Sequence, residues 1–312
     1  MRLPADQIRE RLRGVAAGLL TPFDDTLEVD TDALTENAQS LYDEGVRTFL
    51  ATANISEYHS LSADERVEHA KTSVDALPED ACVLAGVGGS TGDAQELVRS
   101  YERHGVDAMM VMPPDHTYLH ERGLITYYRE LASVTNRPLV PYVRGFDPSV
   151  EFLASLTRVE GVVGVKYALE DPVKLGAAVA EGADDVVWVD GLAEPYAVSY
   201  WAEGVEGFTA GVSNFRPDIG LALYDALEAG RWDRARRIRN ACLPFQRLRN
   251  GTGENNTITG AVSVPVVKKG LELAGFHGGT VREPIVPLSP DEEREVEAVY
   301  DRLEDDIARL VH

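Results

Sequence analysis

The residue with the clearest chemical potential in this chain is a lysine that ends an otherwise apolar run. Lys166 lies in the segment 162–167, Val-Val-Gly-Val-Lys-Tyr, which is typical of a buried strand. An unpaired ammonium in an apolar wall is unfavourable, and burial lowers the lysine pKa toward a neutral amine, a nucleophile that forms Schiff bases with carbonyl compounds. Alternatively, Lys166 reaches solvent from the strand end or pairs with Glu170 or Asp190. Only 5 of the 30 basic residues are lysines, which favours a specific role.

A tyrosine in the preceding apolar segment is the natural partner of this lysine. Tyr142 lies in the segment 138–143, Pro-Leu-Val-Pro-Tyr-Val, and we expect it at the same height as Lys166 on the adjacent strand. A phenol there can relay protons during carbinolamine and imine formation, because each step needs an acid and a base near the reacting carbon. The alternative is a core aromatic whose hydroxyl is satisfied by hydrogen bonds. The nearby lysine favours the catalytic role.

The segments that position these two residues alternate between apolar strands and amphipathic helices. This pattern predicts a parallel sheet covered on both faces, and eight repeats in about 230 residues predict a closed (β/α)8 TIM barrel. No Gly-x-Gly-x-x-Gly motif follows the first strand, which argues against an open dinucleotide-binding sheet. The expected strands are 14–23, 47–52, 82–87, 108–112, 138–143, 162–166, 186–189 and 205–209, and the expected helices between them are 32–44, 61–76, 91–104, 121–134, 148–157, 171–181 and 193–202.

After the eighth expected strand the pattern becomes purely helical. We expect helices at 218–229, 231–249, 257–274 and 291–310, which is more than one barrel-closing helix requires. The chain is therefore divided into a catalytic barrel, residues 1–230, and a C-terminal helical extension, residues 231–312, packed on the barrel. The extension offers a surface for self-association.

The chemistry of a (β/α)8 barrel lies at the carboxyl ends of its strands, so polar residues there are candidates for substrate binding. Arg144 follows Tyr142 and could clamp a distal carboxylate or hydroxyl of the substrate, because a guanidinium binds carboxylates bidentately, although a surface salt bridge with Asp147 or Glu151 is equally compatible with the sequence. The predicted substrate-binding residues, all just after expected strands, are Asn54, Ile55, Ser56, Arg144, Gly191 and Asn214.

Metal and cofactor sites find little support in the sequence. The seven histidines form no His-Glu-x-x-His motif, and His116 and His120, although spaced by four, follow Pro113-Pro114 in an expected loop. We expect no metal and no cofactor, since the lysine itself would serve as the electron sink.

The charge of the chain limits its partners. A net charge of -22 disfavours nucleic acids and anionic membranes as binding partners. The sequence contains no run of 18 apolar residues, so no membrane-spanning helix is predicted. The charged N-terminus lacks the apolar core of a signal peptide, so a cytoplasmic location is expected. The scattered acidic residues and scarce lysines suggest a salt-adapted surface, a hypothesis that molar salt would test.

Several motifs, in order, resemble the dihydrodipicolinate synthase and N-acetylneuraminate lyase superfamily, lysine-dependent barrel enzymes that act on pyruvate or 2-keto acids. The resemblance implies that Lys166 is the Schiff-base lysine, that Tyr142 is the proton-relay tyrosine, and that the protein is a homotetramer. The motifs span nearly the whole chain: Thr21-Pro22-Phe23, Ser56-Glu57 with Ser60-Leu61-Ser62, Ala85-Gly86-Val87-Gly88, Tyr142, and Gly164-Val165-Lys166.

Departures from the superfamily pattern narrow the resemblance. Ala53-Asn54-Ile55-Ser56-Glu57 replaces the usual Gly-Thr-Thr-Gly-Glu, so binding of the keto acid carboxylate would rest on backbone amides with Asn54 or Ser56. Dihydrodipicolinate synthases carry a second tyrosine after the fourth strand, and this chain has Pro113-Pro114-Asp115 there. The difference disfavours a role in lysine biosynthesis. The chain is most similar to the 5-dehydro-4-deoxyglucarate dehydratase branch, through Tyr142 with Arg144, Pro113-Pro114, Ser213-Asn214-Phe215 with Pro217, Leu243-Pro244 with Arg249-Asn250, and Val267-Lys268-Lys269-Gly270-Leu271.

This resemblance implies a dehydratase that acts on a 2-keto-3-deoxy sugar acid of the 5-dehydro-4-deoxyglucarate or 2-keto-3-deoxypentonate type. An aldolase of the 2-keto-3-deoxygluconate type, which releases pyruvate, would need the same lysine and tyrosine. A dihydrodipicolinate synthase and a non-catalytic binding protein are also compatible with the predicted fold. The apolar Ile55 is the feature that supports the non-catalytic binding role.

Overall fold

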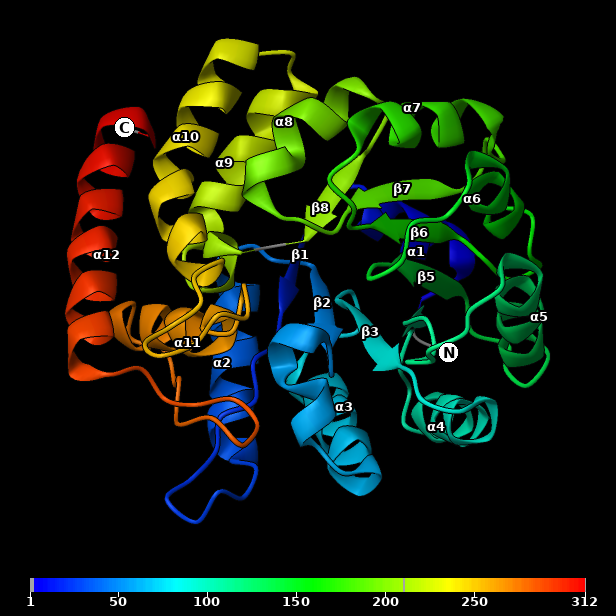
Figure 1. Cartoon of the computed structure of the whole chain (residues 1–312), viewed down its shortest axis with the longest axis horizontal. Helices are drawn as coiled ribbons and strands as arrows, with labels where there is room; N and C mark the ends of the chain where they lie inside the picture. Colours follow the sequence, from blue (N-terminus) through cyan, green and yellow to red (C-terminus); the bar gives the residue numbers. More distant parts are fainter. Residues whose placement is uncertain (1–2, 210, 312) are drawn as a thin grey trace.

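Eight parallel strands form a closed barrel in the computed structural model, which describes residues 3–209 and 211–311 (Figure 1). Each strand pairs with its neighbours in chain order, and β8 closes the ring against β1. The predicted (β/α)8 barrel is therefore confirmed. The strands are β1 (Val15–Gly18), β2 (Thr48–Ala51), β3 (Cys82–Val87), β4 (Ala108–Val111), β5 (Leu139–Val143), β6 (Gly164–Tyr167), β7 (Val187–Asp190) and β8 (Gly207–Thr209).

Helices separate the strands and cover the outside of the barrel. Every strand residue is buried, which explains the continuous apolar runs in the sequence. Several helices begin at a side-chain cap, as at Ser62, whose hydroxyl accepts a hydrogen bond from the Glu65 amide. The helices that precede or connect the strands are α1 (Ala5–Leu12), α2 (Thr31–Asp43), α3 (Ala63–Ala76), α4 (Thr91–Arg103), α5 (Glu121–Ala132), α6 (Val150–Leu156), α7 (Pro172–Glu181) and α8 (Glu194–Ala202).

The helices after β8 form a layer beside the barrel, coloured yellow to red in Figure 1. They are α9 (Pro217–Glu228), α10 (Trp232–Arg249), α11 (Ser263–Leu273) and α12 (Pro290–Val311). A second hydrophobic cluster, which includes Phe208, Phe215 and Phe245, joins these helices to β1 and β8. The C-terminal helices thus pack against the outside of the barrel at β1 and β8.

The helix predicted at 257–274 begins later than expected. Its first six residues are not helical, and α11 starts at Ser263. Gly260 adopts a φ of +78° and Asn255 a φ of +56°, which turn the chain out of the right-handed helical region before α11 begins. The non-helical stretch leads the chain across the barrel mouth and brings the start of α11 to the pocket described below.

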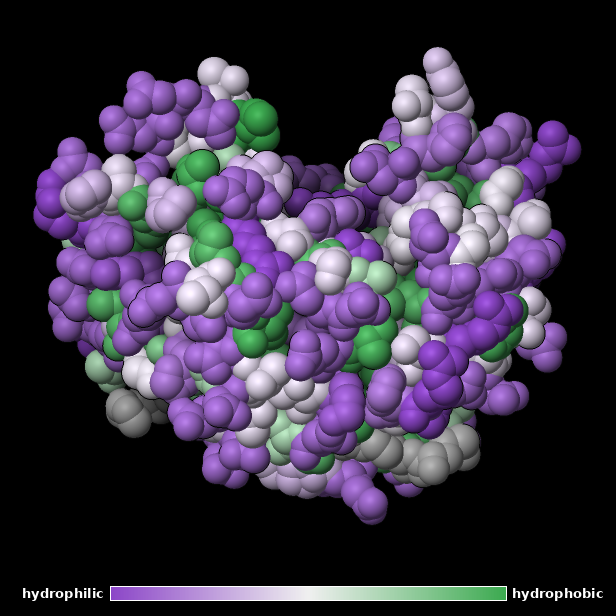
Figure 2. Space-filling view, turned by 90° about the horizontal axis from the view of Figure 1, so that it is seen from below, coloured by the Kyte–Doolittle hydropathy of each residue, from purple (hydrophilic) through white to green (hydrophobic). Residues whose placement is uncertain are grey.

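The molecular surface is largely hydrophilic on the face shown in Figure 2, where apolar residues form small scattered groups. Among the described residues, no helix combines the length and the apolar character needed to cross a membrane.

Candidate active site

Lys166 lies inside the barrel beside Tyr142. The two residues are register partners on β6 and β5, and the Lys166 ammonium nitrogen lies 4.0 Å from the centre of the Tyr142 ring. The side chain is buried, with 7% of the residue exposed, and Nζ donates to the Met110 sulfur at 3.8 Å. Within the described residues Lys166 forms no salt bridge with Glu170, Asp190 or another carboxylate. The amine is therefore buried without a direct counter-ion.

This environment favours the neutral form of the lysine. Burial lowers the pKa of Lys166, and the Arg144 charge acts in the same direction, while Tyr142 and Asp190 oppose the shift. A larger fraction of the amine is consequently unprotonated near neutral pH than in a solvated lysine. The structure thus provides the nucleophile that Schiff-base chemistry needs.

Neighbouring charges and hydrogen bonds lower the pKa of the Tyr142 hydroxyl. Burial would raise its pKa, but the charges of Lys166 and Arg144 and hydrogen bonds from Arg144 and Asn54 outweigh burial and lower it. Arg144 Nη1 donates to Tyr142 Oη at 3.2 Å. The lowered pKa brings the phenol and phenolate forms of Tyr142 closer in free energy near neutral pH, as a group that both gives and takes a proton requires.

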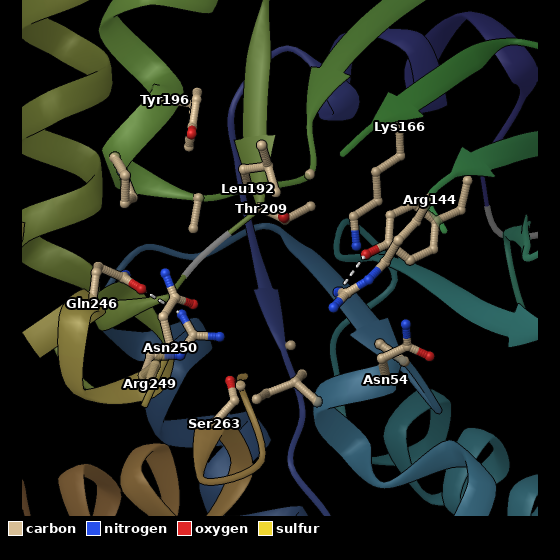
Figure 3. A pocket seen from close by; sticks show the side chains of 18 of the residues that line it. Asn54, Arg144, Lys166, Leu192, Tyr196, Thr209, Gln246, Arg249, Asn250 and Ser263 are labelled. Carbon is tan, nitrogen blue, oxygen red and sulfur yellow. Dashed lines mark hydrogen bonds between the residues drawn. The ribbon is translucent and has the colours of Figure 1, made fainter. Parts of the chain in front are cut away.

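A pocket of about 340 Å³ opens at the carboxyl ends of the strands, and Lys166, labelled in Figure 3, lines it together with Tyr142. This volume suits a small-molecule substrate. Gly191 gives Lys166 its room, because a Cβ there would lie 3.1 Å from Lys166 Cγ and 2.8 Å from Ala168 Cβ. Of the predicted substrate-binding residues, the pocket brings together Asn54, Ile55, Arg144 and Gly191.

The other two predicted binding residues lie behind the pocket wall. The Ser56 hydroxyl accepts from the Ala53 amide at 3.1 Å, and the serine is fully buried within its own short 3₁₀ turn, η1 (Asn54–Ser56). Asn214 Oδ1 accepts from the Gly18 amide at 2.8 Å, which ties the segment after β8 to β1. Both side chains support the site from outside the cavity.

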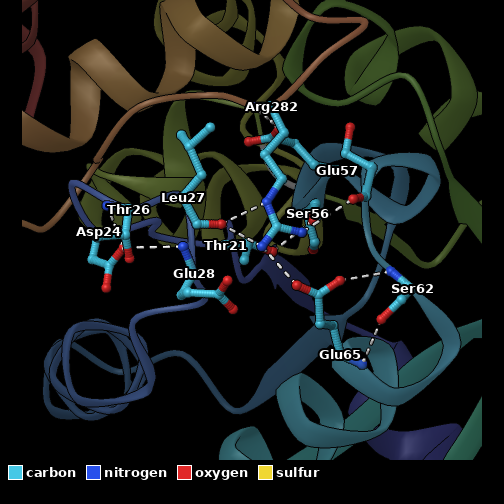
Figure 4. Close-up of polar contacts among 11 residues, drawn as sticks. Thr21, Asp24, Thr26, Leu27, Glu28, Ser56, Glu57, Ser62, Glu65 and Arg282 are labelled. Atoms are coloured by element: carbon cyan, nitrogen blue, oxygen red, sulfur yellow. Dashed lines mark hydrogen bonds and ion pairs between the residues drawn. The ribbon is translucent and has the colours of Figure 1, made fainter.

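A cluster of charged residues, Glu57, Glu65, Lys268 and Arg282, lies next to the η1 turn; Figure 4 shows the part around Arg282. Glu57, in the left-handed conformation with φ of +59°, pairs with Lys268 of α11 at 2.6 Å and accepts from the Arg282 amide at 3.0 Å. The Arg282 side chain pairs with Glu65 at 2.6 Å and donates to the Leu27 carbonyl. Four segments distant in sequence thus meet behind the turn that presents Asn54 and Ile55 to the pocket.

The sequence analysis missed the wall that faces Lys166 from the C-terminal helices. The rule that strand ends carry the chemistry directs attention to the barrel, whereas these residues belong to α10, α11 and the segment between them. The only sequence signal was Arg249-Asn250 in the resemblance to the dehydratase branch. The residues of this wall that line the pocket are Gln246, Arg249, Asn250, Thr259, Gly260, Ser263 and Val264.

The described part of the chain contains no cluster of side chains suited to bind a metal ion. Across residues 3–209 and 211–311, no group of three or more His, Cys, Asp or Glu side chains is placed to hold an ion. His116 and His120 instead accept hydrogen bonds from the nearby backbone amides of Tyr118 and Arg122.

Comparison with known proteins gives consistent matches over nearly the full length. The model of the Dihydrodipicolinate synthetase family matches residues 11–303. The chain is 27% identical to a Bacillus subtilis protein named "Probable 5-dehydro-4-deoxyglucarate dehydratase", over 95% of this chain and 96% of the relative. It is 28% identical to the 4-hydroxy-tetrahydrodipicolinate synthase of Natronomonas pharaonis, over 93% and 97%.

Solved structures agree with this pattern. The crystal structure of dihydrodipicolinate synthase from Oceanobacillus iheyensis superposes with a TM-score of 0.91 at 27% sequence identity, over 97% of this chain and 100% of that chain. The relatives thus share the barrel and its C-terminal helices, while their names assign them different reactions.

Proposed function

Because the chain belongs to the dihydrodipicolinate synthetase family, we propose that it is a lyase that binds its substrate as a Schiff base on Lys166. The family predicted from the ordered motifs is confirmed by the match over residues 11–303. The proposed reaction is dehydration of a 2-keto-3-deoxy sugar acid of the 5-dehydro-4-deoxyglucarate or 2-keto-3-deoxypentonate type. The observation that supports it best is the buried Lys166 amine, which has no direct counter-ion among the described residues and lies 4.0 Å from the Tyr142 ring centre.

The first step is imine formation. The neutral amine of Lys166 attacks the ketone carbon C2, and the carbinolamine then loses its oxygen as water, with Tyr142 supplying and recovering protons. The resulting iminium is cationic and withdraws electrons from the neighbouring carbon C3. A C3 proton thereby becomes acidic enough for removal by the Tyr142 phenolate or by the substrate carboxylate.

The second step separates a dehydratase from an aldolase. Removal of the C3 proton leaves an enamine, whose electrons expel the C4 hydroxyl as water once it has been protonated. In a substrate of the glucarate type, loss of CO₂ can follow and give a dioxo acid. If the bond between C3 and C4 is aligned for cleavage instead, the same lysine and tyrosine release pyruvate, as in a 2-keto-3-deoxygluconate-type aldolase.

The names of the relatives include both a dehydratase and a synthase, and it is the motifs of this chain that favour dehydration over a synthase reaction and over a non-catalytic role. The Bacillus subtilis relative is named a dehydratase, and the motifs of this chain at Tyr142 and Arg144 and in the C-terminal helices resemble the dehydratase branch. A synthase is disfavoured because Pro113-Pro114-Asp115 stands in place of the second tyrosine. A non-catalytic barrel would have no need for a buried amine beside an activated phenol.

Borohydride trapping followed by intact-mass measurement tests the proposal. Wild-type protein in molar salt is incubated with pyruvate or a 2-keto-3-deoxy sugar acid, beside Lys166→Arg and the control Lys71→Arg, whose exposed side chain pairs with Asp75. We expect an adduct in the wild type and the control and none in Lys166→Arg. Its mass distinguishes a whole, a dehydrated and a cleaved substrate. Adducts equal in all three proteins, or absent from all, would refute the Schiff-base function.

We also propose that the enzyme works as a homotetramer in a salt-rich cytoplasm. The family resemblance supports the tetramer, and the net charge of -22 with only 5 lysines supports the salt adaptation. Light scattering would measure the assembly. Equal activity and stability with and without molar salt would rule out the salt adaptation.

A further inference from the structure

The pocket has two cationic ends that derive from different parts of the chain. Lys166 and Arg144 form one end, on β6 and just after β5, while Arg249, the last residue of α10, lies across the cavity (Figure 3). Glu170 is the only acidic residue that lines the described pocket. The cavity is thus lined by two arginines and one lysine against a single carboxylate, in a chain whose net charge is -22. The pocket is therefore suited to an anion with charge at both ends.

Arg249 is fixed in place through neighbours that leave its charge without a direct counter-ion. Its Nη1 donates to Gln246 Oε1 at 2.8 Å, and the Gln246 amide in turn donates to Glu194. The Glu194 carboxylate is already engaged, because Oε1 accepts from the backbone amides of Gly211 and Ser213, each at 3.0 Å. Glutamine thus stands between the guanidinium and the buried carboxylate.

The Arg249 guanidinium lines the pocket without a paired carboxylate among the described residues. Arg249 Nε is buried and has no hydrogen-bond partner among the described residues. Burial also lowers the pKa of Arg249, although an arginine keeps its charge at neutral pH. A partly desolvated guanidinium without a paired carboxylate is unfavourable, and a ligand carboxylate bound in the pocket beside Arg249 would offset that cost.

The start of α11 adds donors on the same wall. Ser263 is the first residue of this helix of 11 residues and lines the pocket with Val264, and the preceding Val262 provides no side-chain cap. The Ser263 amide already donates to the Gly260 carbonyl at 3.1 Å, and Pro265 has no amide hydrogen, so it is the Val264 amide and the positive end of the helix dipole that favour an anion nearby. Arg249 and the start of α11 thus converge on one end of the cavity.

We infer that Arg249 and the first turn of α11 form a subsite for the distal carboxylate of the substrate. This inference rests on the proposed function and names its substrate class: a dicarboxylic 2-keto-3-deoxy sugar acid, preferred over a monocarboxylic one. Arg144 then serves the reacting end, where it donates to the Tyr142 hydroxyl. In this proposal the distal clamp is Arg249 of α10, whereas the sequence analysis considered Arg144 for that role.

The test compares substrates that differ in one carboxylate. Steady-state rates are measured for a dicarboxylic hexaric substrate and for the monocarboxylic acid of the same length and configuration, with wild type, Arg249→Gln and Arg247→Gln. Arg247 is an exposed residue on the same helix outside this pocket and serves as the matched control. Borohydride trapping with pyruvate, which lacks a distal carboxylate, reports imine formation separately.

We expect Arg249→Gln to lower kcat/KM about 100-fold for the dicarboxylate, because a charge-assisted hydrogen bond is lost. Its activity on the monocarboxylate and its pyruvate adduct should stay within about threefold of wild type, and Arg247→Gln should match wild type. An equal loss on both substrates would overturn the subsite, as would a wild-type preference for the monocarboxylate. A wild-type protein that forms no adduct with any keto acid would instead refute the proposed function, which separates the two failures.

Discussion

The buried ion pair between Glu57 and Lys268 makes a sharp prediction about how the C-terminal helices support the site. The Lys268 side chain is 2% exposed and that of Glu57 is fully buried, with 2.6 Å between Nζ and Oε1. Lys268→Met keeps the length and apolar body of the side chain but leaves the Glu57 carboxylate buried without its cation. Removing one partner of a buried pair typically costs about 3–5 kcal/mol.

Part of that cost is reduced by the surroundings of Glu57. The Arg282 amide still donates to Glu57 Oε2 at 3.0 Å, so one oxygen of the carboxylate keeps a hydrogen bond. We therefore expect Lys268→Met to lower the free energy of unfolding by about 3 kcal/mol, the lower end of the range. The double variant Glu57→Gln with Lys268→Met removes both charges and should recover to within about 1 kcal/mol of wild type.

Urea unfolding at neutral pH, in molar salt and at one fixed protein concentration, measures these free energies. Pyruvate trapping provides a local measurement, because the pair holds the turn that presents Asn54 and Ile55 to the pocket. We expect Lys268→Met to trap more slowly than wild type and the double variant to recover. A loss below about 1 kcal/mol in Lys268→Met, or a double variant no more stable than the single one, would refute the role assigned to this pair.

Three further predictions follow from individual side chains. Tyr142→Phe keeps the ring beside Lys166 but removes the proton relay, so kcat should fall about 10²- to 10⁴-fold with unfolding unchanged in urea; a kcat near wild type would exclude the relay. Gly191→Ala places a methyl group 3.1 Å from Lys166 Cγ and should slow borohydride trapping of pyruvate, whereas an unchanged trapping rate would show that Lys166 has room to move. Burial lowers the pKa of His69 from 6.5 to about 4, so the stability that depends on its neutral form is complete above pH 6.5 and is lost as the pH falls toward 4. Urea unfolding at pH 7 and pH 4 should show that wild type loses about 3 kcal/mol more than His69→Leu over this interval, and equal losses would contradict it.

The sequence predicted those parts of the site that depend on local pattern. An apolar run that ends in a lysine identifies a buried strand and its nucleophile together, and the register of β5 and β6 then places Tyr142 beside Lys166, as expected. Side-chain direction within a turn is less predictable. Ser56 was expected in the pocket, yet its hydroxyl accepts from the Ala53 amide inside η1, because a buried turn must satisfy its own polar groups.

Arg249 shows a different limit of sequence analysis. It lies 83 positions from Lys166 on a helix whose pattern indicates only a partly buried surface, and no local signal shows that α10 ends at the barrel mouth. That placement depends on tertiary packing of Phe215 against Phe245, with ring centres 4.9 Å apart, and on the cluster that joins α10 to β8. Contacts of this kind are set by the complementary shapes of distant segments.

The two ends of the pocket therefore depend on two different parts of the fold. Lys166 and Tyr142 stand on neighbouring barrel strands whose hydrogen bonds fix their relative height, so the proposed imine chemistry depends on the barrel. Arg249 and Ser263 stand on helices that pack within the second hydrophobic cluster, so a shift of these helices would move the distal end of the pocket and leave the lysine in place. In such an arrangement substrate choice can change through α10 and α11 while the Schiff-base step is retained, which agrees with one barrel carrying relatives named for different reactions.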